Sequence, residues 1–239
     1  MIGDRVTPVP NWVAAAFAGG VIVTTVWTVI ASVIHFRDWA DRDRAYSNLN
    51  WVGRALHQYH ETYDCFPPAV VYDDNGNRMH SWRAIIVSQL NETISGPTHN
   101  SAYHFDEPWT SPNNRAAADA FPGVSGDFSF LAVVGDEAAW PKAGCRRMRD
   151  ISDGLSETVF VVGIRDLGVG WHEPCDLSFD GEELWLDHDG RRRRIDLSEV
   201  HSFVLFGNAD IKESFQGMAD SEIRKLLTSK AGDRAPDVW

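Results

Sequence analysis

One stretch near the N-terminus limits the folds open to this chain. From Trp12 to Phe36 the sequence contains no Asp, Glu, Lys or Arg, and most of its residues are apolar. As a helix rising about 1.5 Å per residue, this stretch is long enough to cross a hydrocarbon core of about 30 Å. It is too long for the apolar region of a cleaved signal peptide. We therefore expect residues 1–11 to form an N-terminal tail and residues 12–36 to form an uncleaved transmembrane helix.

The helix is expected to continue past the apolar stretch. Beyond it, apolar residues recur at steps of three and four, which is the spacing of one helical face. These residues are Leu49, Val52, Leu56, Tyr59 and Tyr63. No proline interrupts residues 12–66, and a proline pair at 67–68 would end the helix. The pattern predicts that residues 37–66 are an amphipathic continuation of the same helix, packed on a domain.

Residues 67–239 are expected to form one α+β head domain. An Asn-Gly pair at 75–76 lies between two apolar runs, which is a strong hairpin signal. Ser81 and Ser111 each precede a helical pattern and are expected N-caps, and a proline follows the second at the first helical position.

Three later segments have the composition of β-strands, because they are rich in Val, Ile and Phe and are bounded by Gly, Asp and Pro. The segments are DFSFLAVVG, SETVFVVGIR and HSFVLFGNADIKESF, the last with a turn at 207–209. An amphipathic helix through Ile223 and Leu226 follows, with Asp220 or Ser221 as its N-cap and Gly232 at its end. The expected fold is a long N-terminal helix packed on an antiparallel sheet.

The charge of the chain excludes one class of partner. The 239 residues carry a net charge of −12. A phosphate-binding surface needs a basic face, and the single basic run, residues 191–194, reads as a solvated turn or strand end paired with nearby acids. Nucleic acid is therefore not an expected partner. The arginines at 37, 42 and 44 favour a cytoplasmic domain by the positive-inside rule.

Two histidines three residues apart, His57 and His60, can share a helix face, and neutral imidazole is a common metal ligand. Zinc needs three or four ligands, and Asp64 and Cys65 stand too near the helix end to converge with them. We expect no metal site and favour packing or helix-end contacts for both histidines, which are the candidates if a metal does bind. A metal-dependent hydrolase built from His57, His60 and His201 is the corresponding alternative.

No catalytic residue and no cofactor are predicted, so an enzyme is not expected. The sequence around Ser125, GVSGD, does not match the G-x-S-x-G nucleophile motif. The segment WTSPNNR is typical of a capped helix start. In an alternative reading, Trp109, Asn113, Asn114 and Arg115 form the ligand-binding patch of an extracytoplasmic solute-binding or carbohydrate-binding protein.

Seven motifs occur in the order found in a known family. They are YSNLNWVGRALHQYHETYDCFPPA, HSWRAIIVSQL, DEPWTSPNNRAAA, FLAVVG, ISDGLSETVFVVGIRD, HEPCDLSFD and HSFVLFGNADIKE. Through them the chain resembles, over roughly residues 46–233, the large pilin-like family of undefined function that is abundant in planctomycetes. Members of that family carry a type IV prepilin-like N terminus and a C-terminal signature of His, nine residues and Asp-Gly.

The resemblance implies a pseudopilin-type architecture and no established reaction. The helix would be a single-pass anchor in the inner membrane, and the head would face the periplasm, against the charge rule. A role in assembly or surface scaffolding follows, with the lipid bilayer and other pilin-like or secretion-system subunits as partners.

The chain departs from the family pattern in three places. It lacks the run that the prepilin peptidase cuts, so filament entry by the usual route is not expected. Asn208-Ala209 stands where Asp-Gly is usual. The family's usual partner for the cysteine at position 65 is missing, so Cys145 or Cys175 would have to replace it.

Overall fold

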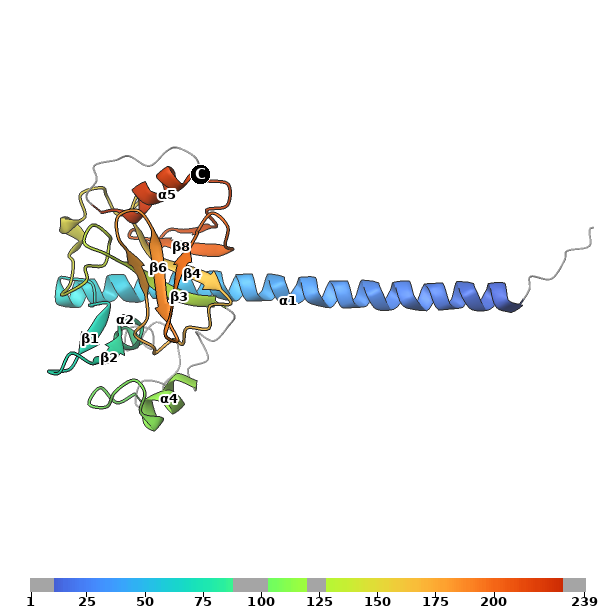
Figure 1. Ribbon diagram of the computed structural model, residues 1–239, viewed down its shortest axis with the longest axis horizontal. Helices are drawn as coiled ribbons and strands as arrows, with labels where there is room; N and C mark the ends of the chain where they lie inside the picture. Colours follow the sequence, from blue (N-terminus) through green and yellow to red (C-terminus); the bar gives the residue numbers. More distant parts are fainter. Residues whose placement is uncertain (1–10, 88–102, 120–127, 230–239) are drawn as a thin grey trace, which may run out of the picture. The chain divides into compact units, whose positions relative to one another are not determined.

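The structure is a computed structural model that describes residues 11–87, 103–119 and 128–229, and within helix α1 the side chains from residue 23 onward. The chain divides into two compact units, residues 1–43 and residues 44–239. Helix α1, Asn11–Tyr63, runs without a break through both, as the long blue ribbon of Figure 1 shows. The continuous helix expected from the sequence is confirmed, but it ends at Tyr63 and not at residue 66.

The expected transmembrane helix over residues 12–36 is not supported. Among the residues that the structure describes, no helix is both long enough and apolar enough to cross a membrane. The described side chains of this stretch begin at Val23, and charge returns at Arg37.

The head contains a seven-stranded sheet in the order β7-β6-β5-β3-β4-β8-β9. The strands are β3 Phe128–Val134, β4 Val159–Arg165, β5 Leu177–Phe179, β6 Leu184–His188, β7 Arg191–Ile195, β8 Ser202–Phe206 and β9 Ile211–Glu213. Neighbouring strands are antiparallel except β3 and β5, which pair in parallel through Val133 with Leu177 and Val134 with Ser178. The expected antiparallel sheet is therefore wrong in this detail, and the sheet is mixed. Strand β4 pairs with one side of β3. The chain later returns as β5 on the other side of β3 and runs in the same direction as β3.

The sheet is buried on both faces, because alternate residues of a strand point to opposite sides. On β3, Phe130 packs with the α1 residues Leu49 and Leu56, whereas Leu131 packs in a second cluster with residues of α5, Asp220–Leu227. On β8 the same alternation holds, with Phe203 in the first cluster. Burial on both faces explains why these strands read as continuous apolar runs. Figure 1 shows α5 in red, close to the sheet.

The smaller elements confirm several local predictions. Strands β1, Val70–Tyr72, and β2, Arg78–Ser81, form the hairpin expected at the Asn-Gly pair. Ser81 caps α2, Trp82–Ile85, because its Oγ accepts a hydrogen bond from Ala84 N. Ser111 caps α4, Pro112–Asp119, in the same way through Asn114 N. A 3-10 turn, η2, covers Met148–Asp150.

Two local expectations need correction. The N-cap of α5 is Ala219, whose backbone N–H is bound by Glu222, and not Asp220 or Ser221. The helix ends at Leu227 because Thr228 is extended, and the predicted stop at Gly232 lies outside the described residues.

The arginine run is the edge strand β7, whose four arginines are exposed, as expected for a charged strand end.

Candidate functional site

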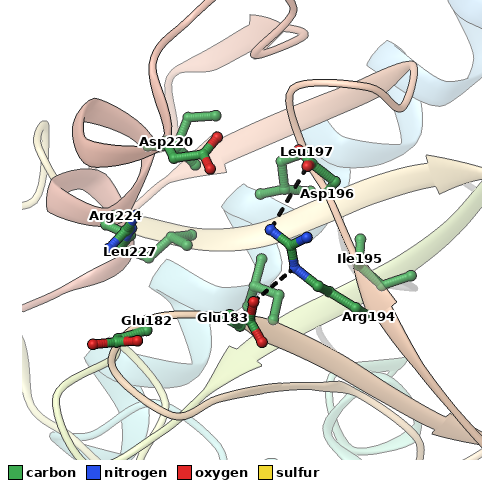
Figure 2. Close-up of a pocket in the computed structure, with 11 residues that line it drawn as sticks. Glu182, Glu183, Arg194, Ile195, Asp196, Leu197, Asp220, Arg224 and Leu227 are labelled. Atoms are coloured by element: carbon green, nitrogen blue, oxygen red, sulfur yellow. Dashed lines mark ion pairs between the residues drawn. The ribbon is translucent and has the colours of Figure 1, made fainter.

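A pocket with a volume of about 110 Å³ lies between α5 and the β6–β7 hairpin. Its buried lining residues are aliphatic: Leu184, Ile195, Leu197, Ile223 and Leu227. Its other lining residues are charged and partly or fully exposed: Glu182, Glu183, Arg194, Asp196, Asp220 and Arg224. Figure 2 shows Arg194 between Glu183 and Asp196, with Asp220 and Arg224 opposite on the helix.

Arg194 is held in place by two carboxylates. Its Nε lies 3.0 Å from Glu183 Oε1, and its Nη2 lies 3.8 Å from Asp196 Oδ2. The Ser198 hydroxyl donates a hydrogen bond of 2.6 Å to Asp196. This bond, with a smaller contribution from Arg194, holds the pKa of Asp196 below its usual value. Asp196 is therefore a carboxylate at neutral pH and can pair with Arg194.

The lining of the pocket combines charged and apolar groups. Its lining groups are carboxylates, guanidinium groups and aliphatic side chains, which offer ion pairing and apolar contact to a small polar molecule. Sequence reasoning missed it, because its residues come from segments that meet only when α5 packs on the sheet. The one available signal was the basic run at 191–194. Because acidic residues surround this run in the sequence, it was interpreted as an ordinary solvated surface.

The candidate metal ligands His57 and His60 are engaged with backbone groups of the head. His57 Nε2 lies 2.8 Å from the carbonyl oxygen of Gly207. His60 Nε2 accepts a hydrogen bond of 3.1 Å from Met148 N. His201, the third histidine of the hydrolase alternative, lies 3.7 Å from Glu213. Within the described part of the chain, no three His, Cys, Asp or Glu side chains are grouped so that they could hold a metal ion.

The predicted ligand-binding patch lies in one stretch before and within α4. The Asn114 side chain is buried and accepts from His104 N, while its amide group donates to the carbonyl oxygens of His104, Glu107 and Pro108. Asn113 donates to the Glu107 carboxylate. Asn114 therefore stabilises the turn that precedes the helix.

The other two residues of the patch are less enclosed. The Trp109 ring lies 5.5 Å from the His172 ring, and Arg115 is exposed. Ligand binding by this patch stays a prediction.

Arg83 is a structural residue that sequence reasoning missed. Its side chain is 1% exposed, and its Nη1 lies 2.6 Å from Asp176 Oδ1. The same oxygen accepts hydrogen bonds from the Trp82 indole and from Ala132 N. Burial raises the pKa of Asp176, and the Arg83 guanidinium opposes this rise. The signal available in the sequence was an arginine beside Trp82, inside an otherwise apolar helical pattern.

The remaining Arg83 donors bind backbone carbonyl groups. The acceptors are the carbonyl oxygens of Phe130, Trp171, Glu173 and Cys175. Two of the segments quoted in the sequence analysis, HSWR and HEPCD, thus meet in the folded head. Because its donors are taken up internally, this cluster positions chain segments.

A protein-family model described as a protein of unknown function (DUF1559) matches residues 37–125. The matched region contains the C-terminal part of α1, the β1–β2 hairpin, α2 and α4. The chain is similar to that family of unknown function over this region. No curated protein and no solved structure matches the chain.

Proposed function

We propose that this protein is a non-catalytic, pilin-like scaffold whose helix α1 holds the head at the inner membrane, with the head in the periplasm. The proposal rests on two features. The apolar segment of α1 exposes side chains that would be buried by another apolar surface, and the polar clusters of the head form their hydrogen bonds within the head. Its partners are the lipid bilayer and other pilin-like or secretion-system subunits.

The observation that carries the proposal is the exposure of α1 before residue 37. Large apolar side chains of this segment are between 47% and 71% exposed, and the helical spacing of 3.6 residues per turn places them along one half of the helix. They are Val23, Val26, Trp27, Val29, Ile30, Val33, Ile34 and Phe36. An exposed apolar surface of this length is expected to be covered by another apolar surface, and lipid can provide one.

The polar groups of this segment suit an apolar surrounding. Thr28 Oγ1 donates to the carbonyl oxygen of Thr25 at 2.8 Å, and Ser32 Oγ donates to that of Thr28 at 2.7 Å. Hydroxyl groups bound in this way to the preceding helical turn expose no unpaired donor. The segment would therefore enter lipid without leaving these donors unsatisfied.

Membrane extraction tests the proposal. The full-length chain should stay with cell membranes after an alkaline carbonate wash, and Ile30→Asp should release it, because a carboxylate at a helix centre costs about 2.5–3.5 kcal/mol in lipid. Thr62→Asp adds the same charge at an exposed position of α1 in the head and should behave like the wild type. Release of the wild-type chain by the wash would overturn the proposal.

A solute-binding protein is the second candidate, and the pocket beside α5 favours it. A small ligand with charged and apolar parts could contact Arg194, Asp220 and the aliphatic base. A ligand that binds only the folded state raises the thermal midpoint, so a screen of amino acids, sugars and small ions tests this candidate. A shift abolished by Arg194→Ala would support it, and the absence of any shift would count against it.

A further inference from the structure

Two cysteines far apart in sequence lie where one segment of the head crosses the end of α1. Cys65 follows the helix directly and is partly exposed, and Cys145 is exposed. The residues next to them are joined by a backbone hydrogen bond, because Phe66 N donates to the carbonyl oxygen of Arg146 at 2.9 Å. The two chain segments therefore run past each other at hydrogen-bonding distance.

Contacts of residues other than the cysteines join the same two chain segments. Met148 N donates to His60 Nε2 at 3.1 Å, and Arg149 Nη2 lies 3.7 Å from Asp64 Oδ2. Together with the backbone bond, these contacts join residues 145–149 to residues 60–66 along their length. The crossing is thus part of the folded head.

The two thiols are neighbours at this crossing. Burial, together with a smaller contribution from the adjacent Cys145 thiol, raises the pKa of the Cys65 thiol to about 11. Tyr59, one turn before the end of α1, has both Cys65 and Cys145 as electrostatic neighbours.

The third cysteine is placed elsewhere. Cys175 is buried, its Sγ donates to the carbonyl oxygen of Asp187 at 3.3 Å, and burial raises its pKa to about 12. A buried thiol with such a pKa reacts slowly with oxidants. Cys145 and Cys65 are therefore the pair that the fold makes available.

We propose that Cys65 and Cys145 are a redox modification site that forms an intramolecular disulfide by exchange with a disulfide oxidant, either a small molecule or an oxidoreductase. The Cys145 thiolate attacks one sulfur of the oxidant, a mixed disulfide forms, and one thiolate of the oxidant leaves. The Cys65 thiolate then attacks the Cys145 sulfur, and the second thiolate of the oxidant leaves. Two protein thiols are oxidised and lose two protons, and the oxidant disulfide is reduced to two thiols.

The order of attack follows from exposure. Cys145 is the more accessible thiol, so it meets the oxidant first, and Cys65 completes the exchange from within the crossing. Because the pKa of Cys65 is raised to about 11, little of it is thiolate at neutral pH. The second step should therefore become faster as the pH rises toward that value.

The disulfide would lock the end of α1 to the head. It would close the loop from residue 65 to residue 145, which contains β1, β2, α2, α4 and β3. Cross-linking a loop of this length restricts the unfolded chain far more than the folded one. For a chain of this size we expect oxidation to raise the thermal midpoint by roughly 5–15 °C.

The experiment uses the full-length chain, purified in its reduced form and incubated with oxidised glutathione. Intact mass should show the loss of two hydrogen atoms, and non-reducing peptide mapping should link the peptides of Cys65 and Cys145. Cys175→Ser should form the same link. Cys65→Ser should stop at a glutathione adduct on Cys145, because the resolving thiol is missing.

Three results would overturn the proposal. The first is a wild-type chain that carries only glutathione adducts, and the second is a link that includes Cys175. The third is an oxidised chain whose thermal midpoint equals that of the reduced chain. Cys175→Ser controls for losses of stability that come from replacing a cysteine.

Discussion

At the scale of single residues, buried polar side chains decide how distant segments of the head meet. Arg83 and Asp176 join α2 to the segment before β5, and Asn114 stabilises the turn before α4. Both α2 and α4 are short, so propensity alone would not hold them in place. The hydrogen bonds of Arg83 to Asp176 and of Asn114 to its neighbouring carbonyl groups fix the positions of these helices.

The Arg83 cluster gives a ranked prediction. Arg83→Met should lower the free energy of unfolding by about 3–5 kcal/mol, because it leaves Asp176 as an unpaired buried charge and leaves carbonyl groups without donors. Asp176→Asn should cost less, about 1–3 kcal/mol, because an amide oxygen still accepts from Trp82 and Ala132. Urea unfolding of both variants measures the difference, and the reverse ranking would contradict this account of the cluster.

His80 gives a prediction about pH. Its Nε2 must donate to the carbonyl oxygen of Phe105 at 2.9 Å, so its Nδ1, 3.1 Å from the Tyr103 hydroxyl, accepts when the ring is neutral. Burial lowers the pKa of His80, and the Phe105 carbonyl opposes this effect. Below the unfolded pKa of about 6.5, the unfolded chain binds more protons than the folded one. Stability should therefore fall as the pH drops below that value.

His80→Gln tests the assignment, since glutamine keeps a donor and an acceptor but does not titrate. Urea midpoints of the wild type and the variant should be compared at several pH values between 5 and 7.5. We expect a shallower loss of stability toward low pH in the variant. Equal slopes would show that His80 is not responsible.

At the scale of elements, the sequence predicted those whose pattern is local. The continuous helix, the β1–β2 hairpin, the two serine caps and the β8–β9 hairpin each follow from neighbouring residues. Strands β5, β6 and β7 were not predicted, because β5 has only three residues and β6 and β7 mix apolar with charged residues. The parallel pairing of β3 with β5 also escaped prediction, since it depends on a return of the chain across more than 40 residues.

The candidate site was predictable only in part for the same reason. The individual charges around the pocket are visible in the sequence, but their convergence requires α5 to lie beside the β6–β7 hairpin. For the histidines at 57 and 60 the sequence favoured packing or helix-end contacts, but it could not show which backbone groups they would contact.

The packing of α1 on the sheet gives a prediction for Gly163 of β4. A Cβ at this position would lie 2.9 Å from ring atoms of Phe130 and 3.7 Å from Leu49 Cδ1. Gly163→Val should therefore force the Phe130 ring to shift and lower the free energy of unfolding by about 1–3 kcal/mol, despite the higher strand propensity of valine. Chemical denaturation measures this. A stabilised variant would show that the α1 face of the sheet is more loosely packed than described.

At the scale of the whole molecule, the chain combines two units with different surfaces. Most large apolar residues in the described part of the unit of residues 44–239 are buried around the sheet, whereas those described in the first unit are exposed. A chain with one self-sufficient unit and one uncovered apolar unit is expected to act where another apolar phase is present. The proposed scaffold role rests on this contrast.

Protease accessibility in intact cells, in cells with a permeabilised outer membrane and in lysed cells tests the central claim most directly. The account predicts that the head is digested once the outer membrane is opened, while a fragment that contains the apolar part of α1 stays protected with the membrane. A chain that is protected until the cells are lysed, or that is recovered free of membrane in full, would contradict the proposed anchor and orientation.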